Sequence, residues 1–511
     1  MKRIVTFLLA LTMALSLCAC APKQEQTPVA EGLKVGYGKV NVSPTMSLPL
    51  EGYQGSDAAE FRWSTTVEMP FYAICVAFTD AKDNTVLLIT VDMLNAYMAD
   101  GMRDGVSGRT GVPKENIMFH CTHNHSGMSV RYKDPAVSTY LNELTNGVIT
   151  AAENAMRDRK PAQMFSTFAR PERVNSVRHY LLADGSYQSY AVGSVPKANL
   201  IGHYSVADNL LQVLKFTREG GKDVVMVNWQ GHPPGTDPKT IATSNYPGVL
   251  RNYLEVNMNC DAVFFLGGSG NLNNSSQIPG EIDHSSYQEL GETLAKAAME
   301  AAANFAPMQT QNIIIKENVM GLTNKNGGVQ KVWLYAISIG DFALVTAPFE
   351  IFDNNAMAVR EASSYPMTFY LSCTNGSNGY LPTPPSFDWA ITYESRTTSF
   401  PKGTAELVQA ELSGMLAELF TQTGNAVREK REGYVRSEFV PKTDGVTYQI
   451  PEPGNMDAIK PVQNGFYAIV LHNPGAKNML VKDMELATQI MQKDSVKLLF
   501  DEQNVIVGIA E

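Results

Sequence analysis

The sequence predicts an α/β domain with a mixed sheet, with a site at the carboxyl ends of the strands, followed by a small β-rich C-terminal domain. Short apolar, β-prone runs alternate with stretches of helical length, which is typical of α/β proteins. Five of these runs end in a polar cluster, and ligands of open α/β sheets sit outside the carboxyl ends of strands. Beyond about residue 433 the pattern changes to short strands. At 511 residues the chain is also long enough for two domains.

The composition indicates a globular protein and excludes some functions. Hydrophobic residues make up 44% and charged residues 18% of the chain, and no internal apolar run is long enough to span a bilayer. The net charge of −10 argues against nucleic acid as a partner. Four internal cysteines are widely spaced without a CxxC pair, which argues against a disulfide framework and a Cys-type zinc site: Cys75, Cys121, Cys260 and Cys373.

The N-terminal sequence is typical of a processing signal. Lys2 and Arg3 precede an apolar run that ends in Leu17-Cys18-Ala19-Cys20, a tetrad that resembles a bacterial lipobox. We therefore expect residues 1–20 to be a lipoprotein signal peptide, with Cys20 lipidated and the protein anchored to the membrane outside the cytoplasm. Residues 21–32 would be a linker. An ordinary secretory peptide is the alternative.

The elements follow in order along the chain. The first four strands are predicted at residues 35–44, 72–78, 85–91 and 114–119. A helix over residues 138–159 has the expected periodicity, and Pro161 ends it. Residues after it, to about 205, are more polar and rich in turns.

The later part repeats this pattern. Strands are predicted at residues 206–216, 223–229, 261–266, 342–346 and 368–371. Helices are predicted at 287–304 and 404–420. The C-terminal domain, residues 433–511, would contain a helix at 484–492 among strands at 446–450, 465–472, 496–500 and 504–509.

The segment from Ile117 to Gly127 holds the most distinctive chemistry. It places three of the eight histidines within six residues, directly after a strand. Neutral imidazole is a common zinc ligand, and two histidines separated by one residue can approach one centre. The alternative is a polar loop whose histidines are merely hydrogen-bonded.

Five polar strand ends could converge on one site: His123/His125, His232, Asn271/Asn273, Glu350 and Tyr380. Two histidines, one glutamate and an open position would form a hydrolytic zinc centre that acidifies a bound water. The residues alone indicate a candidate zinc hydrolase.

Several short motifs, in order, resemble those of the neutral/alkaline ceramidase family. They are Gly36 to Pro44, Thr85 to Asp92, Thr122-His123-Asn124-His125-Ser126-Gly127, Asn228-Trp229 with His232, Ala347-Pro348-Phe349-Glu350, and Tyr380-Leu381-Pro382-Thr383 with Tyr393-Glu394. The likeness covers residues 33–425. It implies a ceramidase-like zinc hydrolase domain, although Asn41 replaces the usual acidic residue.

The resemblance also implies the roles of individual residues. The zinc ligands would be His123, His232, Glu350 and Tyr380, since a metal can lower the pKa of a tyrosine enough to recruit it. His125 would face the substrate and donate to the amide oxygen or the developing oxyanion. Arg178 and Tyr393 resemble the family's substrate-side Arg and Tyr. For Arg178, a surface ion pair is the alternative.

The chain departs from the family in its Gly-rich loop, Gly270 to Ser275. Asn273 stands where ceramidases carry a serine with a catalytic role, and Asn271 replaces an acidic residue. Zinc-activated water would then attack the carbonyl directly, with Asn273 hydrogen-bonded to the tetrahedral intermediate.

The reading is a zinc-dependent amidohydrolase that cleaves an N-acylated, lipid-like amphiphile such as ceramide. Another amide or ester, such as an N-acyl amino acid or a cell-wall fragment, is the second candidate. The rivals are a ceramidase-fold binding lipoprotein that has lost turnover, favoured by Asn271 and Asn273, and a two-lobed solute-binding lipoprotein without a metal.

Overall fold

The computed structural model describes residues 32–52, 62–189, 197–236, 238–278, 280–282, 286–310, 312–389 and 392–510. The predicted signal peptide, its lipidated Cys20 and all but the last residue of the linker lie outside these ranges. Within these ranges, no helix combines the length and the apolar character needed to cross a membrane.

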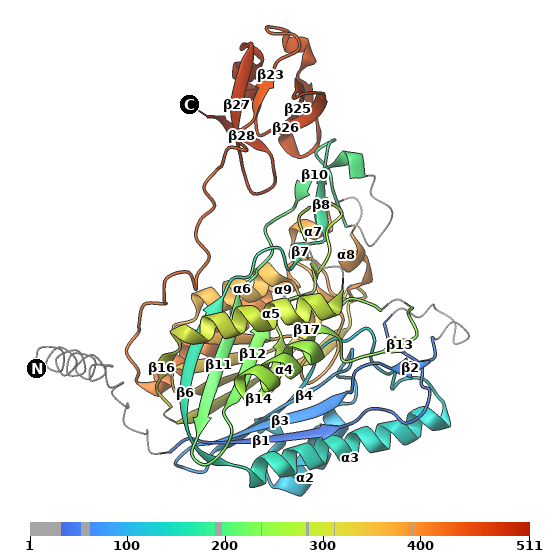
Figure 1. Cartoon of the computed structure of the whole chain (residues 1–511), viewed down its shortest axis with the longest axis vertical. Coiled ribbons are helices and arrows are strands. Elements are labelled where there is room, and N and C mark those ends of the chain that lie inside the picture. Colours follow the sequence, from blue (N-terminus) through green and yellow to red (C-terminus); the bar gives the residue numbers. More distant parts are fainter. Residues whose placement is uncertain are drawn as a thin grey trace, which may run out of the picture.

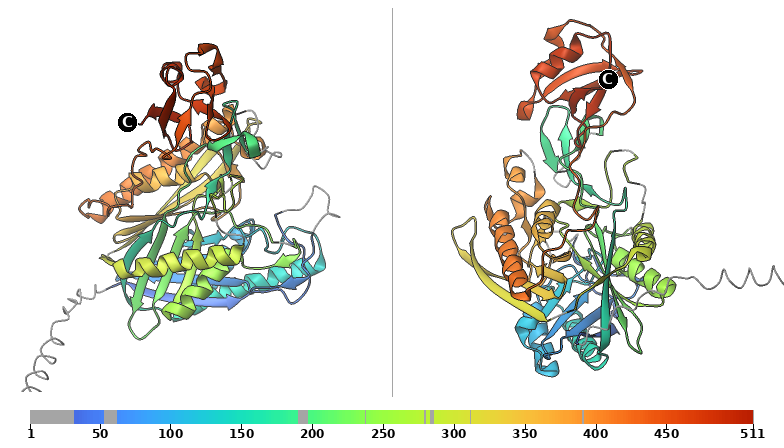
Figure 2. Two further views of the ribbon diagram at one scale, coloured as in Figure 1. Left: turned by 45° about the horizontal axis from the view of Figure 1, so that its top comes forward. Right: turned by 90° about the vertical axis from the view of Figure 1, so that its left-hand side faces the viewer.

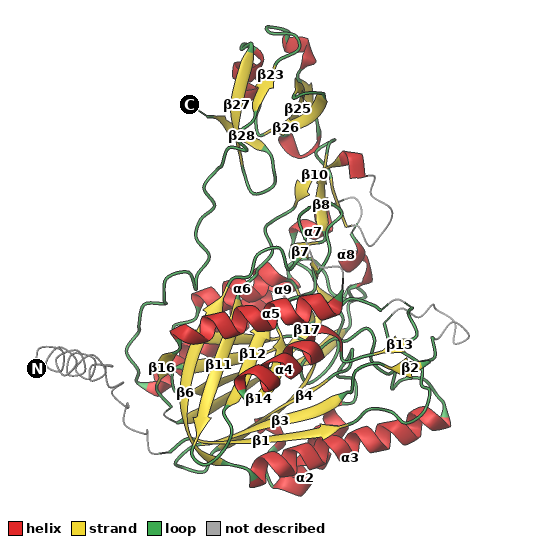
Figure 3. Cartoon of the chain, in the orientation of Figure 1, coloured by secondary structure: helices red, strands yellow, loops and turns green. Residues whose placement is uncertain are grey.

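Two packed β-sheets with helices on their outer faces form the main body (Figures 1 and 3). The larger sheet has nine strands in the order β14-β12-β11-β6-β1-β3-β4-β5, with β16 beside β6. Their bounds are β1 (Lys34–Asn41), β3 (Tyr72–Thr79), β4 (Thr85–Val91), β5 (Ile117–Cys121), β6 (Lys160–Ala169), β11 (Leu211–Arg218), β12 (Val224–Trp229), β14 (Asp261–Leu266) and β16 (Ala306–Met308). The predicted mixed sheet is confirmed, because β4–β5 and β12–β14 are parallel while β1–β3 and β6–β11 are antiparallel.

The smaller sheet has four strands in the order β17-β18-β19-β21. They are β17 (Ile313–Thr323), β18 (Val329–Ile339), β19 (Phe342–Thr346) and β21 (Met367–Leu371). Fully buried side chains from both sheets, such as Val76, Phe216 and Phe369, form one core between them. This burial of apolar surface holds the two sheets face to face.

Helices cover the outer faces, and their buried sides complete the other cores (Figure 2). On the larger sheet lie α2 (Ala99–Thr110), α3 (Pro135–Arg157), α4 (Asn245–Met258) and α5 (Tyr287–Ala301), and on the smaller sheet α6 (Asp353–Ala362) and α9 (Thr404–Thr423). Gly36 and Gly38 of β1 allow α3 to pack closely, since a Cβ on either would lie within 2.0 Å of a carbonyl oxygen of that helix.

Some boundaries differ from the sequence prediction. Lys114–Asn116 form a 3-10 turn, so strand β5 begins at Ile117. The stretch after Pro161, expected to be irregular, begins with β6, a strand in the middle of the large sheet. Buried residues alternate with partly exposed ones over the first part of β6, at Ala162, Met164 and Ser166. Pro161 lies near the start of the strand, where the lack of an N–H donor is tolerated.

Short elements surround the strand ends. They are β2 (Thr66–Val67) with β13 (Ile241–Ala242), β7 (Ser176–Val177) with β15 (Leu272–Asn273), β20 (Glu350–Ile351) with β22 (Tyr380–Leu381), the sheet of β8 (His179–Leu182), β9 (Tyr187–Ser189) and β10 (Leu200–His203), and helices α7 (Pro385–Asp388) and α8 (Tyr393–Thr397). They carry most of the side chains of the site.

The C-terminal region is β-rich, as predicted, and lies at one end of the molecule beyond β8 and β10 (Figures 1 and 2). Its six-stranded sheet contains β23 (Thr447–Gln449), β24 (Lys460–Pro461), β25 (Tyr467–His472), β26 (Ala476–Val481), β27 (Ser495–Phe500) and β28 (Ile506–Ile509), next to helix α10 (Met484–Met491). Leu181 and Tyr187 share a small apolar core with Leu480 and Val505. The region is thus docked on the β8–β10 sheet.

Candidate metal centre

The histidine-rich loop leaves β5 at a sharp turn. His123 has a left-handed backbone conformation, with φ of 58°, and such strained non-glycine residues cluster at functional sites. Asn124 holds the turn, because its side chain donates to the carbonyl of Thr243 at 2.6 Å and accepts from the amide of Ser126 at 2.9 Å. The turn directs His123 and His125 to the same side of the loop.

His120, the first histidine of the stretch, is a structural residue. Its Nε2 accepts a hydrogen bond from the amide of Leu266 at 3.0 Å, and its Nδ1 lies 2.9 Å from the hydroxyl of Thr90. Burial lowers the pKa of His120 to about 3, so the ring is neutral. The hydrogen-bonded alternative therefore describes His120, whereas His123 and His125 face another group.

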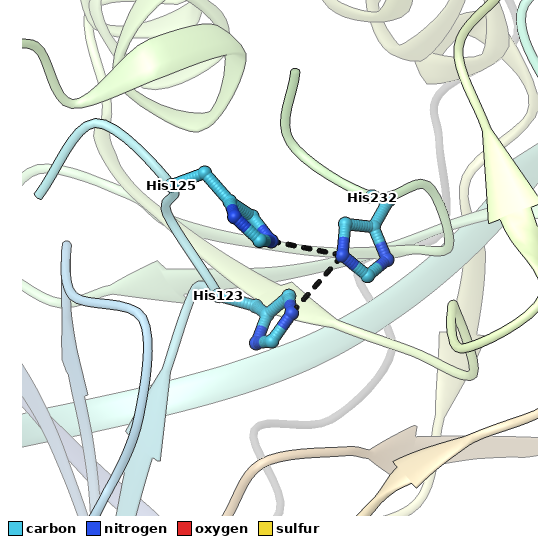
Figure 4. Close-up of side chains that lie close together, drawn as sticks. All are labelled: His123, His125 and His232. Atoms are coloured by element: carbon cyan, nitrogen blue, oxygen red, sulfur yellow. Dashed lines mark hydrogen bonds between the residues drawn. The ribbon is translucent and has the colours of Figure 1, made fainter. Parts of the chain in front are cut away.

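That group is His232, which follows β12 (Figure 4). Its Nε2 lies 3.1 Å from Nε2 of His123 and 2.9 Å from Nε2 of His125. Glu350, at the start of β20, brings a carboxylate oxygen to 3.2 Å from Nε2 of His123. Three imidazoles and one carboxylate thus meet from segments far apart in the sequence.

Hydrogen bonds on the far side of the rings fix the tautomers. Nδ1 of His123 lies 3.0 Å from the carbonyl of Leu94, and Nδ1 of His232 lies 3.3 Å from the carbonyl of Ser269. A carbonyl can only accept, so each Nδ1 carries a proton in the neutral ring and each Nε2 presents a lone pair. Two lone pairs at 3.1 Å repel each other unless a cation lies between them.

Either a proton or a metal ion between the two Nε2 atoms would remove this repulsion. Burial acts to lower the pKa of His123, but the neighbouring carboxylate of Glu350 raises it well above its usual value. Burial, together with the nearby His123, lowers the pKa values of His125 and His232, and keeps both rings in the form that binds metals. Zinc bound tetrahedrally to nitrogens at about 2.0–2.1 Å would separate its ligands by about 3.3 Å, close to the spacing of these rings.

The donor set therefore fits a metal ion. His123, His125 and His232 are the three residues whose ligand atoms all lie within 4.8 Å of one another. Glu350 joins them through His123, and the carboxylate oxygen that lies 3.2 Å from Nε2 of His123 is buried and meets no hydrogen-bond geometry with the described residues. His125, predicted on the substrate side, thus also lies within reach of the same centre.

Tyr380, the fourth predicted ligand, is placed by strand pairing. The two-stranded parallel ladder of β20 and β22 pairs it directly with Glu350. Burial raises the pKa of Tyr380 well above its usual value, so its phenol is neutral unless a cation stabilises the phenolate. Its ring packs edge-on against Tyr393, with centroids 5.6 Å apart.

Arg178 is buried, with only 6% of its surface exposed, which removes the surface ion-pair alternative. Its Nε donates to Glu394 at 2.5 Å, and His179 contacts the other carboxylate oxygen at 2.9 Å. Burial would raise the pKa of Glu394, but Arg178 and His179 lower it to about 2. Although burial acts in the opposite direction, Glu394 raises the pKa of Arg178.

A cavity of about 760 Å³ opens on the cluster. Six predicted site residues line it: His125, Arg178, His232, Asn273, Tyr380 and Tyr393. Asn271 instead exchanges two hydrogen bonds with Asp353, donating to its carboxylate at 2.7 Å and accepting from its amide at 2.8 Å. Asn271 therefore holds the Gly-rich loop in place through Asp353. An acidic residue at position 271 would place a second carboxylate next to that of Asp353.

Sequence reasoning missed two neighbours of these residues. Glu394 stood in a quoted motif but was given no role, and its burial against Arg178 depends on the short helix α8. Cys373 lies with its sulfur 3.6 Å from Nδ1 of His123 and also has a positive φ of 49°. Nothing in the spacing of these residues signalled either contact.

Together these features define an α/β protein with a buried histidine and carboxylate centre at the converging strand ends, open to a pocket. No family model and no curated protein matches the chain. Solved structures do match: a ceramidase complexed with C2 is 14% identical with a TM-score of 0.62, covering 86% of this chain and 84% of that chain. The neutral ceramidase from Pseudomonas aeruginosa is 14% identical with a TM-score of 0.61, covering 88% and 92%.

The chain therefore has the fold of the neutral ceramidases. The resemblance inferred from short motifs is confirmed at this level, with little sequence identity remaining.

Proposed function

We propose that this chain is a zinc-dependent amidohydrolase that cleaves the amide of an N-acylated, lipid-like amphiphile, with ceramide as the reference substrate. One observation carries the proposal: imidazole lone pairs and a carboxylate converge next to a cavity of about 760 Å³. The ceramidases that share the fold support the substrate class.

His123, His232, Glu350 and Tyr380 would hold the zinc ion, with His125 next to it. A bound zinc ion supplies a Lewis acid and lowers the pKa of a water molecule at an open position. The carbonyls of Leu94 and Ser269 hold the two Nδ1–H groups, and so keep both Nε2 lone pairs directed at the centre.

The remaining residues act on the amide. Asn273 and Arg178 line the cavity beside His232 and would place N–H donors next to the reacting amide. His125 would hydrogen-bond the same oxygen, and Tyr393 would orient the substrate from the wall of the cavity. With an amide at position 273, the side chain there binds and does not attack.

Metal content tests the proposal. The purified protein is expected to hold about one zinc ion per chain by elemental analysis, and His123→Ala should lose it. His472→Ala, a histidine of β25 in the C-terminal region, is the matched control and should retain it. Release of fatty acid from ceramide should follow zinc content. A folded wild-type protein that cannot be loaded with zinc would show that the hydrolase reading is wrong.

We also propose that the protein is anchored outside the cytoplasm through lipidated Cys20. The support is the Leu17 to Cys20 tetrad after a basic and apolar leader. Cys20→Ser should move the protein from the membrane fraction of its host to the soluble fraction, and retention of the variant on membranes would contradict the anchor.

A further inference from the structure

Two residues that line the cavity each carry a buried donor without a hydrogen-bond acceptor among the described residues. Among the described residues, neither Nη2 of Arg178 nor Nδ2 of Asn273 has a hydrogen-bond partner, although both atoms are buried. Leaving a buried donor unpaired is unfavourable, so each such group calls for a partner. Both residues line the cavity that contains the histidine cluster.

Strand pairing puts Arg178 and Asn273 on the same face of one short ladder. In the β7–β15 ladder Asn273 lies opposite Ser176, and the amide of Arg178 continues the ladder by donating to the carbonyl of Asn271 at 2.9 Å. Arg178 is two residues beyond Ser176, so it lies diagonally from Asn273 on the same face. Such diagonal neighbours are about 7–8 Å apart, which the long arginine side chain spans.

The chemistry of this pair favours a carboxylate. A guanidinium and an amide N–H offer only donors, and the planar guanidinium matches the two oxygens of a carboxylate. A hydroxyl would also need an acceptor for its own proton. The carboxylate among the residues that line the cavity belongs to Glu68, which is exposed. Glu394 occupies the Nε edge of Arg178 and Tyr380 lies close to the guanidinium, while no acceptor among the described residues meets hydrogen-bond geometry with Nη2.

Apolar side chains also line the cavity: Pro233, Pro234, Ile241 and Leu290. The pocket therefore offers apolar surface as well as two donors for an anionic group. An acyl chain would contact the apolar side chains, and an anionic group close to the amide would reach the donors of Arg178 and Asn273.

We propose that the substrate is an N-acyl amino acid whose carboxylate is bound by Arg178 and Asn273, an inference that rests on the proposed amidohydrolase function. Water adds across the C–N bond: its OH goes to the acyl carbon and its hydrogen to the nitrogen. The products are a fatty acid and a free amino acid. Asn273, which replaces the family's serine, thus becomes a specificity residue.

Matched substrates test the proposal on the zinc-loaded protein. N-dodecanoylglycine and N-dodecanoylethanolamine have the same acyl chain, but one ends in a carboxylate and the other in a hydroxyl. We expect kcat/KM to favour the glycine compound at least 10-fold. Asn273→Asp, which has the same shape and adds a negative charge, should reduce this ratio at least 10-fold, mainly through KM.

A control separates a direct contact from the general field of an added charge. Gln288→Glu adds the same charge at another lining position, in the first turn of α5, and should change the ratio less than threefold. Equal or better turnover of the ethanolamide by the wild type would overturn the carboxylate proposal and leave the amidohydrolase intact.

A binding measurement distinguishes failure of the carboxylate site from failure of the proposed amidohydrolase function. If neither of these amides nor ceramide is cleaved, the proposed function fails, and calorimetry with N-dodecanoylglycine then decides on the carboxylate site alone. Binding at least 10-fold tighter to the wild type than to Asn273→Asp supports that site, and equal affinity refutes it.

Discussion

Replacing Glu394 with glutamine should remove a large and pH-dependent part of the stability of this protein. The carboxylate is fully buried between Arg178 and His179, and its pKa falls from 4.5 to about 2. At about 1.4 kcal/mol per pKa unit, that depression corresponds to about 3 kcal/mol of stability near neutral pH. Glu394→Gln also leaves a buried guanidinium without its counter-ion, which typically destabilises by about 3–5 kcal/mol.

The sign of the pH dependence follows from the direction of the shift. The folded state holds the pKa of Glu394 below its unfolded value, so the contribution is complete above about pH 4.5. It disappears as the pH falls toward about 2, because both states then bind the proton. The stability difference between wild type and variant should therefore shrink as the solution is acidified.

Urea unfolding followed by tryptophan fluorescence measures this, since Trp389 packs against His179 with ring centroids 5.0 Å apart. Glu418→Gln is the control: Glu418 is 61% exposed and pairs with Lys316 on the surface, where such a pair contributes at most about 1 kcal/mol. A loss below about 1 kcal/mol for Glu394→Gln at pH 7, or an equal loss at pH 7 and pH 3, would refute the reasoning.

Two further changes test the loops around the centre. Asn271→Asp sets a second carboxylate against Asp353, whose pKa burial already raises, and should destabilise the protein by about 2–3 kcal/mol in urea unfolding. Combining it with Asp353→Asn restores one donor and one acceptor, so the double variant should recover at least half of the loss; no recovery would contradict the pairing. Gly52→Ala would place a Cβ 2.4 Å from Nδ1 of His125 at a φ of 106°, and should lower kcat/KM at least 10-fold by displacing the ring. Gly108→Ala in α2, where no atom lies within 4 Å of the added Cβ, is its control, and equal activity of both variants would show that the position of His125 does not matter.

Several strands could be predicted from the sequence because their signal is local. Strands β14 and β19 match the predicted residues 261–266 and 342–346, since uninterrupted apolar runs bounded by polar residues define buried strands. Helix α4 was missed because Pro247 and Gly248 stand near its start, where helix propensity is low. Its stability comes instead from Tyr246, Leu250 and Leu254, which pack into the core beneath it.

The site could also be predicted only in part, because the sequence shows which residues are unusual but not which tertiary contacts they make. The sequence at the end of β5 presents His120, His123 and His125 alike, and only the amide of Leu266, which hydrogen-bonds His120, distinguishes the structural ring from the other two. Glu394 reaches Arg178 across 216 residues of sequence. No periodicity could have predicted that contact, because it depends on how β7 and α8 come together.

The docking of the C-terminal region connects the most distant part of the chain to the cavity. Asn464 donates to the carbonyl of Gly185 at 2.7 Å, and Tyr187 contacts Gln503 at 2.9 Å. The C-terminal region therefore contacts both the turn of the β8–β9 hairpin and strand β9. The first residue of β8 is His179, next to Arg178. The C-terminal region thus supports one wall of the pocket from outside, while the three histidines of the cluster all belong to the main body. Changes in the C-terminal region would therefore act first on the Arg178 side of the pocket, and not directly on the histidine cluster.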